Sequence, residues 1–172
     1  MVETTNAAFK LSDNKNWKDL AIGIDLGGSN CYVGIYLDKK FHIVKNEQGK
    51  ENTPAYIQFG KESKTLGQPA YSSAHKNPSN TLYNIKRLLG KKMDDPKLKE
   101  ILTRLPYKVV AGNGNKPKVV VDHLGDEISY SPIDLTAMFL KNMKKLAESA
   151  AGNHTINNAV ITVPASFTHL QR

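Results

Sequence analysis

An apolar strand, a Gly-Gly turn and a second apolar strand follow one another in residues 21–35, AIGIDLGGSNCYVGI. This feature constrains the fold most, because two apolar strands joined by so short a connection form an antiparallel hairpin. Gly27 and Gly28 have no Cβ, so the backbone there can take positive φ and can bring its N–H groups close to an anion. The same residues also make a good hairpin with no ligand, and this segment alone leaves both interpretations open.

Two polar side chains flank the glycines. Ser29 carries a hydroxyl that donates and accepts. Asp25 is a hard oxygen ligand at the end of an expected buried strand, suited to Mg²⁺ that is held through water beside a phosphate. A carboxylate at this position also serves to cap the turn. The pattern therefore indicates a phosphate site as a hypothesis.

Composition limits the classes of protein that remain. The 172 residues suffice for one sizeable core or for two small subdomains. The formal net charge is +8, but the lysines are spread along the whole chain instead of being gathered with aromatic residues, which argues against a nucleic-acid site. Cys31 is the single cysteine, so no internal disulfide forms, and its position in a strand indicates a small buried hydrophobe in a reducing compartment.

The N-terminal segment and the hydropathy pattern bear on location. Residues 1–20 hold no apolar run of signal-peptide length and are expected to form a flexible extension. No stretch of the sequence approaches the length of a membrane span. We therefore expect a cytoplasmic protein.

The middle of the chain predicts short elements. FHIVKN (41–46) reads as a third strand of a meander and AYIQF (55–59) as another strand, with loops between them and on to Gly67. Residues 79–90 predict a short helix that ends at Gly90, and a second helix is capped by Asp94 or Asp95 with Pro96 in its first turn. Residues 107–110 and 116–122 predict a hairpin around AGNGN.

The last third gives the clearest pattern. Ser131, Pro132 and Asp134 predict the start of a helix that spans 132–151, with Gly152 at its end. Its mostly apolar face consists of Leu135, Met138, Phe139, Asn142, Met143, Leu146 and Ala150. The run NNAVITVPASF (157–167) then predicts a parallel strand that is buried on both faces.

At this point the ordered segments resemble a known family. GIDLGGSNCYVGI, NEQGKENTPAYIQF, NPSNTLYNIKRLLGKKMDD (77–95), SPIDLTAMFLKNMKKLAE and NNAVITVPASFTHLQR are similar to the nucleotide-binding domain of the heat-shock protein 70 chaperones. The resemblance covers residues 21–172, and the segment 77–95 is its most specific part. It implies an α/β, ribonuclease-H-like (actin-like ATPase) half-domain with a mixed sheet, incomplete at its C-terminus. Subdomain IA would comprise 21–54 and 117–172, and an inserted α+β subdomain IB would comprise 55–116.

The resemblance also implies roles for individual residues. Asp25 would hold Mg²⁺ through water between the β- and γ-phosphates of ATP, and Lys86 would be the catalytic lysine. The phosphates would lie against the loop formed by Gly27, Gly28, Ser29 and Asn30. Pro164 and Arg172 would relay the nucleotide state to a peptide-binding domain. Read without the family, Lys86 is a solvated helix charge beside Arg87, and Pro164 simply ends a strand.

Departures from the family pattern keep alternatives open. The family usually has threonine at the position of Gly28 and commonly an aromatic residue at that of Asn30, so we expect weaker or slower nucleotide handling. A non-hydrolysing, partner-binding chaperone-like protein is one alternative. A sugar kinase is another, because GGSN resembles the sugar-kinase phosphate turn, but nothing in 77–95 resembles a sugar site.

The expected parent protein is an ATP-dependent chaperone that hydrolyses ATP to drive binding and release of unfolded polypeptide clients. Its implied partners are a J-domain protein and a nucleotide exchange factor. The second phosphate loop and the adenine-binding elements of the family have no counterpart in these residues, so this chain is expected to be a lobe with little or no ATPase activity. It should expose apolar surface and tend to self-associate.

Overall fold

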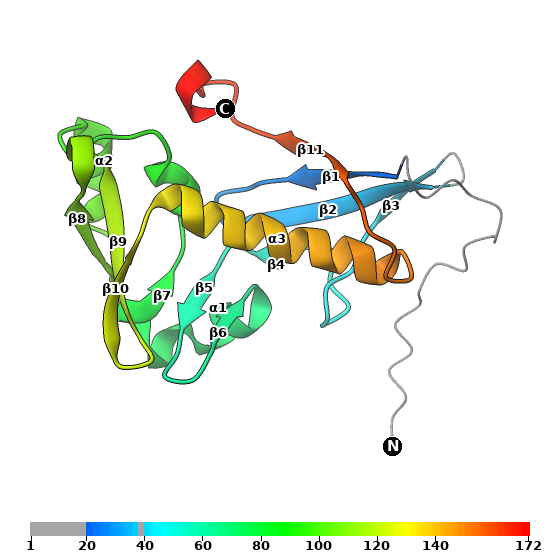
Figure 1. The fold of residues 1–172 in the computed structure, drawn as a ribbon, viewed down its shortest axis with the longest axis horizontal. Coiled ribbons are helices and arrows are strands. Elements are labelled where there is room, and N and C mark those ends of the chain that lie inside the picture. Colours follow the sequence, from blue (N-terminus) through cyan, green and yellow to red (C-terminus); the bar gives the residue numbers. More distant parts are fainter. Residues whose placement is uncertain (1–19, 38–39) are drawn as a thin grey trace.

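The structure is a computed structural model that describes residues 20–37 and 40–172. The extension expected at 1–20 lies outside the described residues except for Leu20. Figure 1 shows the elements, whose order along the chain is β1 (Ala21–Asp25), β2 (Asn30–Leu37), β3 (Lys40–Ile43), β4 (Thr53–Pro54), β5 (Ile57–Phe59), β6 (Lys64–Leu66), α1 (Gln68–Ser73), η2 (Ala74–Lys76), η3 (Pro78–Asn80), β7 (Thr81–Leu82), η4 (Ile85–Leu88), α2 (Pro96–Leu102), β8 (Lys108–Ala111), η5 (Asn113–Asn115), β9 (Pro117–His123), β10 (Asp126–Tyr130), α3 (Pro132–Ala150), β11 (Asn158–Thr162) and η6 (His169–Gln171).

A mixed sheet in the order β11-β1-β2-β3 forms the framework, and β4 adds to β2. Strands β1, β2 and β3 pair antiparallel, which confirms the predicted meander. Strand β11 pairs parallel with β1, so that Asp25 lies opposite Thr162. The parallel pairing is the arrangement expected for a strand that returns after a helix.

Helix α3 covers one face of this sheet, beneath β1 and β2 in the view of Figure 1. Its start is the predicted one: the Ser131 hydroxyl accepts from the Asp134 N–H at 3.1 Å and donates to Asp134 Oδ2 at 2.6 Å. This capping box and Pro132 at the first helical position satisfy the helix start. The helix ends before Gly152, which has φ 69°.

The core lies between α3 and the sheet. The buried residues of α3 are Pro132, Leu135, Phe139, Met143 and Ala147. They pack against the inward positions of the meander, which are Ile22, Ile24, Cys31, Val33 and Ile35. Apolar residues at every second strand position and at helical spacing thus meet in one core, because each element is apolar on one side.

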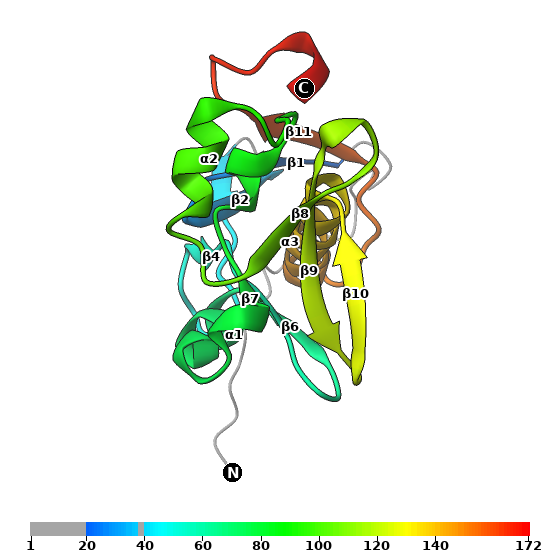
Figure 2. The ribbon, with the colours of Figure 1, turned by 90° about the vertical axis from the view of Figure 1, so that its left-hand side faces the viewer.

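Two smaller sheets extend the structure near the N-terminal end of α3, and both ribbon views place β8, β9 and β10 there (Figures 1 and 2). One has the order β10-β9-β8 and the other β6-β5-β7. The hairpin of β8 and β9 and the helix α2, capped by Asp95, agree with the prediction. Strands β6 and β10 and helix α1 are additions that the sequence pattern did not show.

The helix predicted over 79–90 is wrong. Thr81 and Leu82 form β7 and pair with Gln58 and Ile57, and a 3₁₀ turn, η4, follows. Asn84 breaks any helix because it takes φ 57°, in the left-handed region. The buried Thr81 hydroxyl accepts from Gln58 Nε2 at 2.8 Å and donates to the Asn77 carbonyl at 2.7 Å, so strand pairing prevails over helical periodicity.

The outer face of the main sheet is not covered by the described residues. Strand β11 is exposed at every position, so the expectation that it is buried on both faces is wrong for this structure. Val160 is 71% exposed and Phe41 74% exposed. Val160, Gly23, Gly34 and Ile43 are consecutive cross-strand partners, so they form one row of this face. We call the exposed apolar residues on it, Tyr32, Tyr36, Phe41, Ile43 and Val160, the outer sheet face.

The sheets also bear on the expected subdomains. Lys108 to Ala111 of β8 pair with Pro117 to Val120 of β9, so a boundary between residues 116 and 117 runs through a hairpin. The division into 21–54 with 117–172 and 55–116 remains a proposal. A boundary that follows the sheets lies after β10, at Ser131, where α3 begins.

The capping box of α3 generates a first prediction. Replacing Ser131 by alanine should lower the free energy of unfolding by about 1 kcal/mol, because a helix N–H loses its acceptor. Urea denaturation followed by circular dichroism measures this loss. The Ser131 hydroxyl and N–H lower the pKa of Asp134, so the capping contribution is present above the unfolded-state pKa and is lost as the pH falls through the folded-state pKa.

Ser129→Ala is the matched control, since Ser129 is exposed on β10, outside the capping box. This variant should unfold within about 0.5 kcal/mol of the parent chain. Equal losses for the two serine variants would contradict a specific capping role for Ser131.

Candidate phosphate-binding site

The turn between β1 and β2 is shaped by Gly27. A Cβ built on Gly27 would lie 1.8 Å from the Asn30 carbonyl oxygen, so only glycine fits at this position. The Gly27 N–H donates to the Asp25 carbonyl at 3.2 Å. Neither Gly27 nor Gly28 uses the positive φ that is open to glycine. Close approach of the backbone, and not a left-handed conformation, requires the first glycine.

Gly28 is in a different situation. A Cβ at Gly28 would meet no heavy atom within 4 Å. The fold therefore has room for a side chain at Gly28, and the departure from the threonine of the resembling family is not imposed by packing.

The end of the turn forms hydrogen bonds with the residues on either side of β4. The Ser29 carbonyl accepts from the Ala55 N–H at 2.8 Å, and Asn30 Oδ1 accepts from Asn52 Nδ2 at 3.1 Å. The Asn30 amide oxygen is thus engaged within the protein. Ser29 is exposed.

Asn46 supports this connection, and sequence analysis did not single it out. It is buried, its Nδ2 donates to the Asn52 carbonyl at 2.9 Å, and its Oδ1 accepts from the N–H groups of Gln48 and Lys50 at 3.0 Å. A buried amide with its polar atoms paired holds a loop in one shape. The hydrogen bonds of Asn46 therefore fix the shape of the loop that contacts Asn30.

Lys86 also lies at this turn, although it is 60 residues away from Leu26 in the sequence. It lies on η4, which is anchored by the buried Ile85 and Leu88. Its Nζ donates to the Leu26 carbonyl in a short hydrogen bond and lies 6.0 Å from the centre of the Phe167 ring. Lys86 is half-buried whereas Arg87 is exposed, so the structure does not present Lys86 as a solvated helix charge.

Asp25 closes the turn at the end of β1. Its side chain is exposed, and Asp25 Oδ1 accepts from the Thr162 hydroxyl at 2.6 Å. Sequence analysis did not identify Thr162, although a parallel strand after α3 must bring some residue beside Asp25. The structure thus places one carboxylate and one ammonium at the same turn, from positions far apart in the chain.

Cys31 lies beneath the turn and is fully buried, which confirms its interpretation as a small core residue. Its Sγ donates to the Gly27 carbonyl at 3.7 Å. Burial raises the pKa of the Cys31 thiol to about 11, with a further rise from the Asp25 charge, against opposing effects of the hydrogen bond to Gly27 and of Lys86. The thiol is neutral at physiological pH and is not a nucleophile.

The segment from Pro164 to Arg172 folds back towards η4. The Pro164 carbonyl accepts from the Phe167 N–H at 3.0 Å. Gln171 Nε2 donates to the Leu89 carbonyl at 2.9 Å, and Gln171 packs on Gly90. Arg172 is exposed, and its guanidinium donates within its own segment, to the carbonyls of Phe167 at 3.3 Å and Ala165 at 3.5 Å.

The carboxylate of Asp25 at the turn is a suitable ligand for Mg²⁺. Within residues 20–37 and 40–172 no three His, Cys, Asp or Glu side chains gather into a metal cluster. A single exposed carboxylate fits Mg²⁺, which commonly binds through one or two carboxylates together with water and substrate phosphates. The residues present therefore suit a magnesium ion that arrives with a phosphate ligand.

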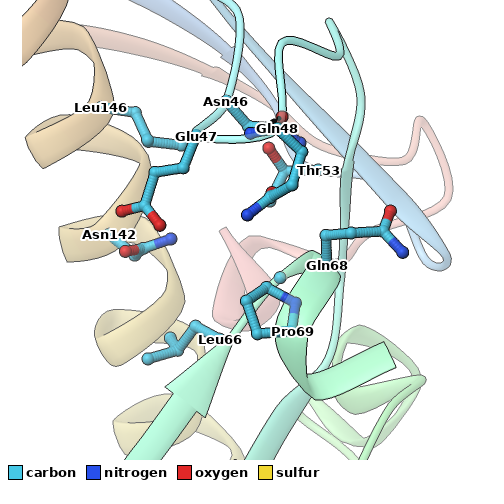
Figure 3. Close-up of a pocket in the computed structure, with 10 residues that line it drawn as sticks. Asn46, Glu47, Gln48, Thr53, Leu66, Gln68, Pro69, Asn142 and Leu146 are labelled. Atoms are coloured by element: carbon cyan, nitrogen blue, oxygen red, sulfur yellow. Dashed lines mark hydrogen bonds between the residues drawn. The ribbon is translucent and has the colours of Figure 1, made fainter. Parts of the chain in front are cut away.

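A separate hollow lies between α3 and the loop before β4. Figure 3 shows its lining, which comes from the loop 46–48, from the start of α1 and from Asn142 and Leu146 of α3. Asp25, Gly27, Gly28 and Lys86 do not line this hollow. It is thus distinct from the candidate phosphate site.

The fold defines a class of protein, namely an α/β actin-like ATPase half-domain, and the candidate phosphate turn lies between its first two strands. The family model described as "Hsp70 protein" matches residues 21–172. The chain therefore belongs to the Hsp70 family. This membership decides against the sugar-kinase alternative.

Individual relatives agree. The chain is 42% identical to a heat shock protein of Pyricularia oryzae over 90% of its own length and 25% of that protein. It is 40% identical to a ribosome-associated molecular chaperone of Eremothecium gossypii over 88% of its length and 24% of that protein. It is 39% identical to "Heat shock cognate 70 kDa protein 3" of Dictyostelium discoideum over 88% of its length and 24% of that protein.

The chain thus spans about a quarter of the length of these relatives. None of the helices in the described part of the chain is both long and apolar enough to cross a membrane.

The two glycines of the turn should respond differently to substitution. Gly27→Ala should destabilise the chain by about 1–3 kcal/mol, because the new methyl group overlaps the Asn30 carbonyl. Gly28→Ala should stay within about 0.5 kcal/mol of the parent, because the same group enters open space. Thermal and urea unfolding of both variants measure the difference, and a tolerated Gly27→Ala would show that the turn relaxes easily.

Proposed function

We propose that this chain is the first lobe of the nucleotide-binding domain of an ATP-dependent Hsp70 chaperone. The observation that carries the proposal is the hydrogen bond from Lys86 Nζ to the Leu26 carbonyl, which holds a lysine at the turn that begins with Asp25. A cation and a carboxylate beside exposed backbone and Ser29 groups match what a magnesium–phosphate ligand needs.

Each residue of the site then has a role in the proposal. Gly28 and Ser29 would offer backbone and hydroxyl groups to the phosphates. Gly27, whose N–H donates to the Asp25 carbonyl, shapes the turn, and Asn30 supports it through Asn52. Lys86 places positive charge where negative charge accumulates on a transferring phosphoryl group. Asp25 would hold Mg²⁺ through its water shell, and the bound ion would neutralise charge on the β- and γ-phosphates. Such catalysis of phosphoryl transfer to water rests on positioning and electrostatics.

The segment from Pro164 to Arg172 is proposed as the relay to a peptide-binding domain. The support is its contact with the turn that carries Lys86, through Phe167 against Lys86 and Gln171 against Leu89. A change in the position of Lys86 on phosphate binding would therefore alter the contacts of this segment.

In the complete chaperone the proposed clients are unfolded polypeptides, with a J-domain protein and a nucleotide exchange factor as co-chaperones. The support is the family membership and the name of the Eremothecium gossypii relative, a ribosome-associated molecular chaperone. A cytoplasmic location is part of the proposal. It agrees with the one free, buried cysteine, since reducing compartments leave thiols unpaired.

A non-hydrolysing, partner-binding role is the second candidate. The open space at Gly28 favours it, because a residue with a phosphate-binding hydroxyl would fit there and the chain has none. The contact of Lys86 with the turn nevertheless supports nucleotide binding of reduced strength.

The isolated chain should behave as a half-site. The described residues supply one carboxylate and one ammonium at the turn, too few groups to enclose a nucleotide and orient a water molecule. Titration calorimetry with Mg²⁺·ATP and Mg²⁺·ADP should detect no binding tighter than millimolar, and phosphate release should equal that of buffer. Micromolar binding that is lost in Asp25→Asn and Lys86→Ala would show instead that this chain builds a complete site.

The outer sheet face should drive self-association of this chain with a second copy. It presents exposed aromatic and aliphatic side chains, with the rings of Tyr36 and Phe41 packed 5.1 Å apart, beside the free edge of β11. Sedimentation velocity should show oligomers that grow with concentration, and Phe41→Lys combined with Val160→Lys should reduce them. Leu124→Lys, at an exposed apolar residue of the β9–β10 turn, is the control and should leave the oligomers unchanged.

A further inference from the structure

The geometry points to Thr162 as a positioning residue that holds the Asp25 carboxylate in the orientation needed to bind a magnesium–nucleotide ligand. The inference rests on the proposed function of the phosphate turn and adds a residue to it. Thr162 is the last residue of β11 and the Cα partner of Asp25 in the parallel pairing of β1 and β11.

The contact itself is a strong one. The Thr162 hydroxyl donates to Asp25 Oδ1 at 2.6 Å, a length typical of a hydroxyl bound to an ionised carboxylate. Threonine is branched at Cβ and therefore stiff at χ1. Both strands are fixed by the sheet, so the hydroxyl approaches the carboxylate from a defined direction.

Asp25 needs such a partner because its surroundings leave it free to rotate. Its side chain is exposed, and an exposed aspartate samples several χ1 rotamers. Among the described residues no other side chain forms a hydrogen bond or ion pair with it: Lys86 is bound to the Leu26 carbonyl instead. Thr162 alone selects one orientation of the carboxylate.

The hydrogen bond also gives the two carboxylate oxygens of Asp25 different roles. Oδ1 accepts from Thr162, and Oδ2 has no partner among residues 20–37 and 40–172. The free oxygen and the remaining lone pairs are available to the water shell of a metal ion. Partners that orient a ligating carboxylate in this way typically change metal affinity by about 10–100-fold when they are removed.

Four ¹⁵N,¹³C-labelled chains test the inference by NMR: the parent chain, Thr162→Val, Thr162→Ser and Thr155→Val. Valine keeps the shape of threonine and lacks the hydroxyl, whereas serine keeps the hydroxyl. Thr155→Val makes the same chemical change at an exposed residue of the loop before β11. Three-bond couplings report χ1 of Asp25, and the amide signals of Gly27 and Gly28 report titration with millimolar Mg²⁺·ADP.

We expect Thr162→Val to average the χ1 couplings of Asp25 and to weaken Mg²⁺·ADP binding about tenfold. Thr162→Ser and Thr155→Val should retain both properties of the parent. Cross-strand contacts between the backbones of β1 and β11 confirm that each variant is folded.

Two results would overturn the inference while the proposed function stands. One is a Thr162→Val chain in which Asp25 keeps a single rotamer, and the other is an averaged rotamer with unchanged affinity. If the amides of Gly27 and Gly28 in the parent chain do not respond to Mg²⁺·ADP even far above millimolar concentrations, the turn is not a phosphate site, and the proposed function and the role of Thr162 fail together.

Discussion

The parallel pairing of β1 with β11 is the constraint on which the rest of the site depends. It joins Ala21–Asp25 to Asn158–Thr162, two segments more than a hundred residues apart in the chain. Closing so long a loop is entropically costly, and the buried face of α3, which lies directly before β11, offsets that cost. Once the register is set, Asp25 lies opposite Thr162, and the chain after β11 starts at the phosphate turn.

The second determinant of the site is the path of the chain around residue 84, where a strand and a 3₁₀ turn form in place of the predicted helix. A regular helix over 79–90 would put its charges on a solvated face. Instead β7 pairs with β5, and Asn84 in the left-handed region redirects the chain so that Ile85 and Leu88 are buried. Lys86 then faces the Leu26 carbonyl. The lysine is placed by the burial of its apolar neighbours and not by a local sequence preference.

The turn itself combines rigidity with open space. Gly27 is required by the approach of the Asn30 carbonyl, and the loop organised by Asn46 supports the far side. Gly28 and Ser29 are left unencumbered. The proposed phosphate site would need fixed donors that face an unfilled volume. The rigid Gly27 and the open space at Gly28 support that proposal. The outer sheet face is also uncovered, because its apolar side chains on β3 and β11 have no cover among the described residues.

Local patterns in the sequence were sufficient for the hairpin of β1 and β2, for the capping box of α3 and for the parallel return of β11. The first two depend on contacts between residues close in the chain, and the third was predicted from a continuous apolar run that follows a helix. Asp25 was singled out by its place at the end of an apolar strand, and Lys86 was named through the ordered resemblance to a family. Tertiary structure alone decided that Lys86 meets the turn, that Thr162 binds Asp25 and that Gly27 is required by contact and not by positive φ. The physical reason is that these contacts join distant segments, whose register and burial follow from packing of the whole core.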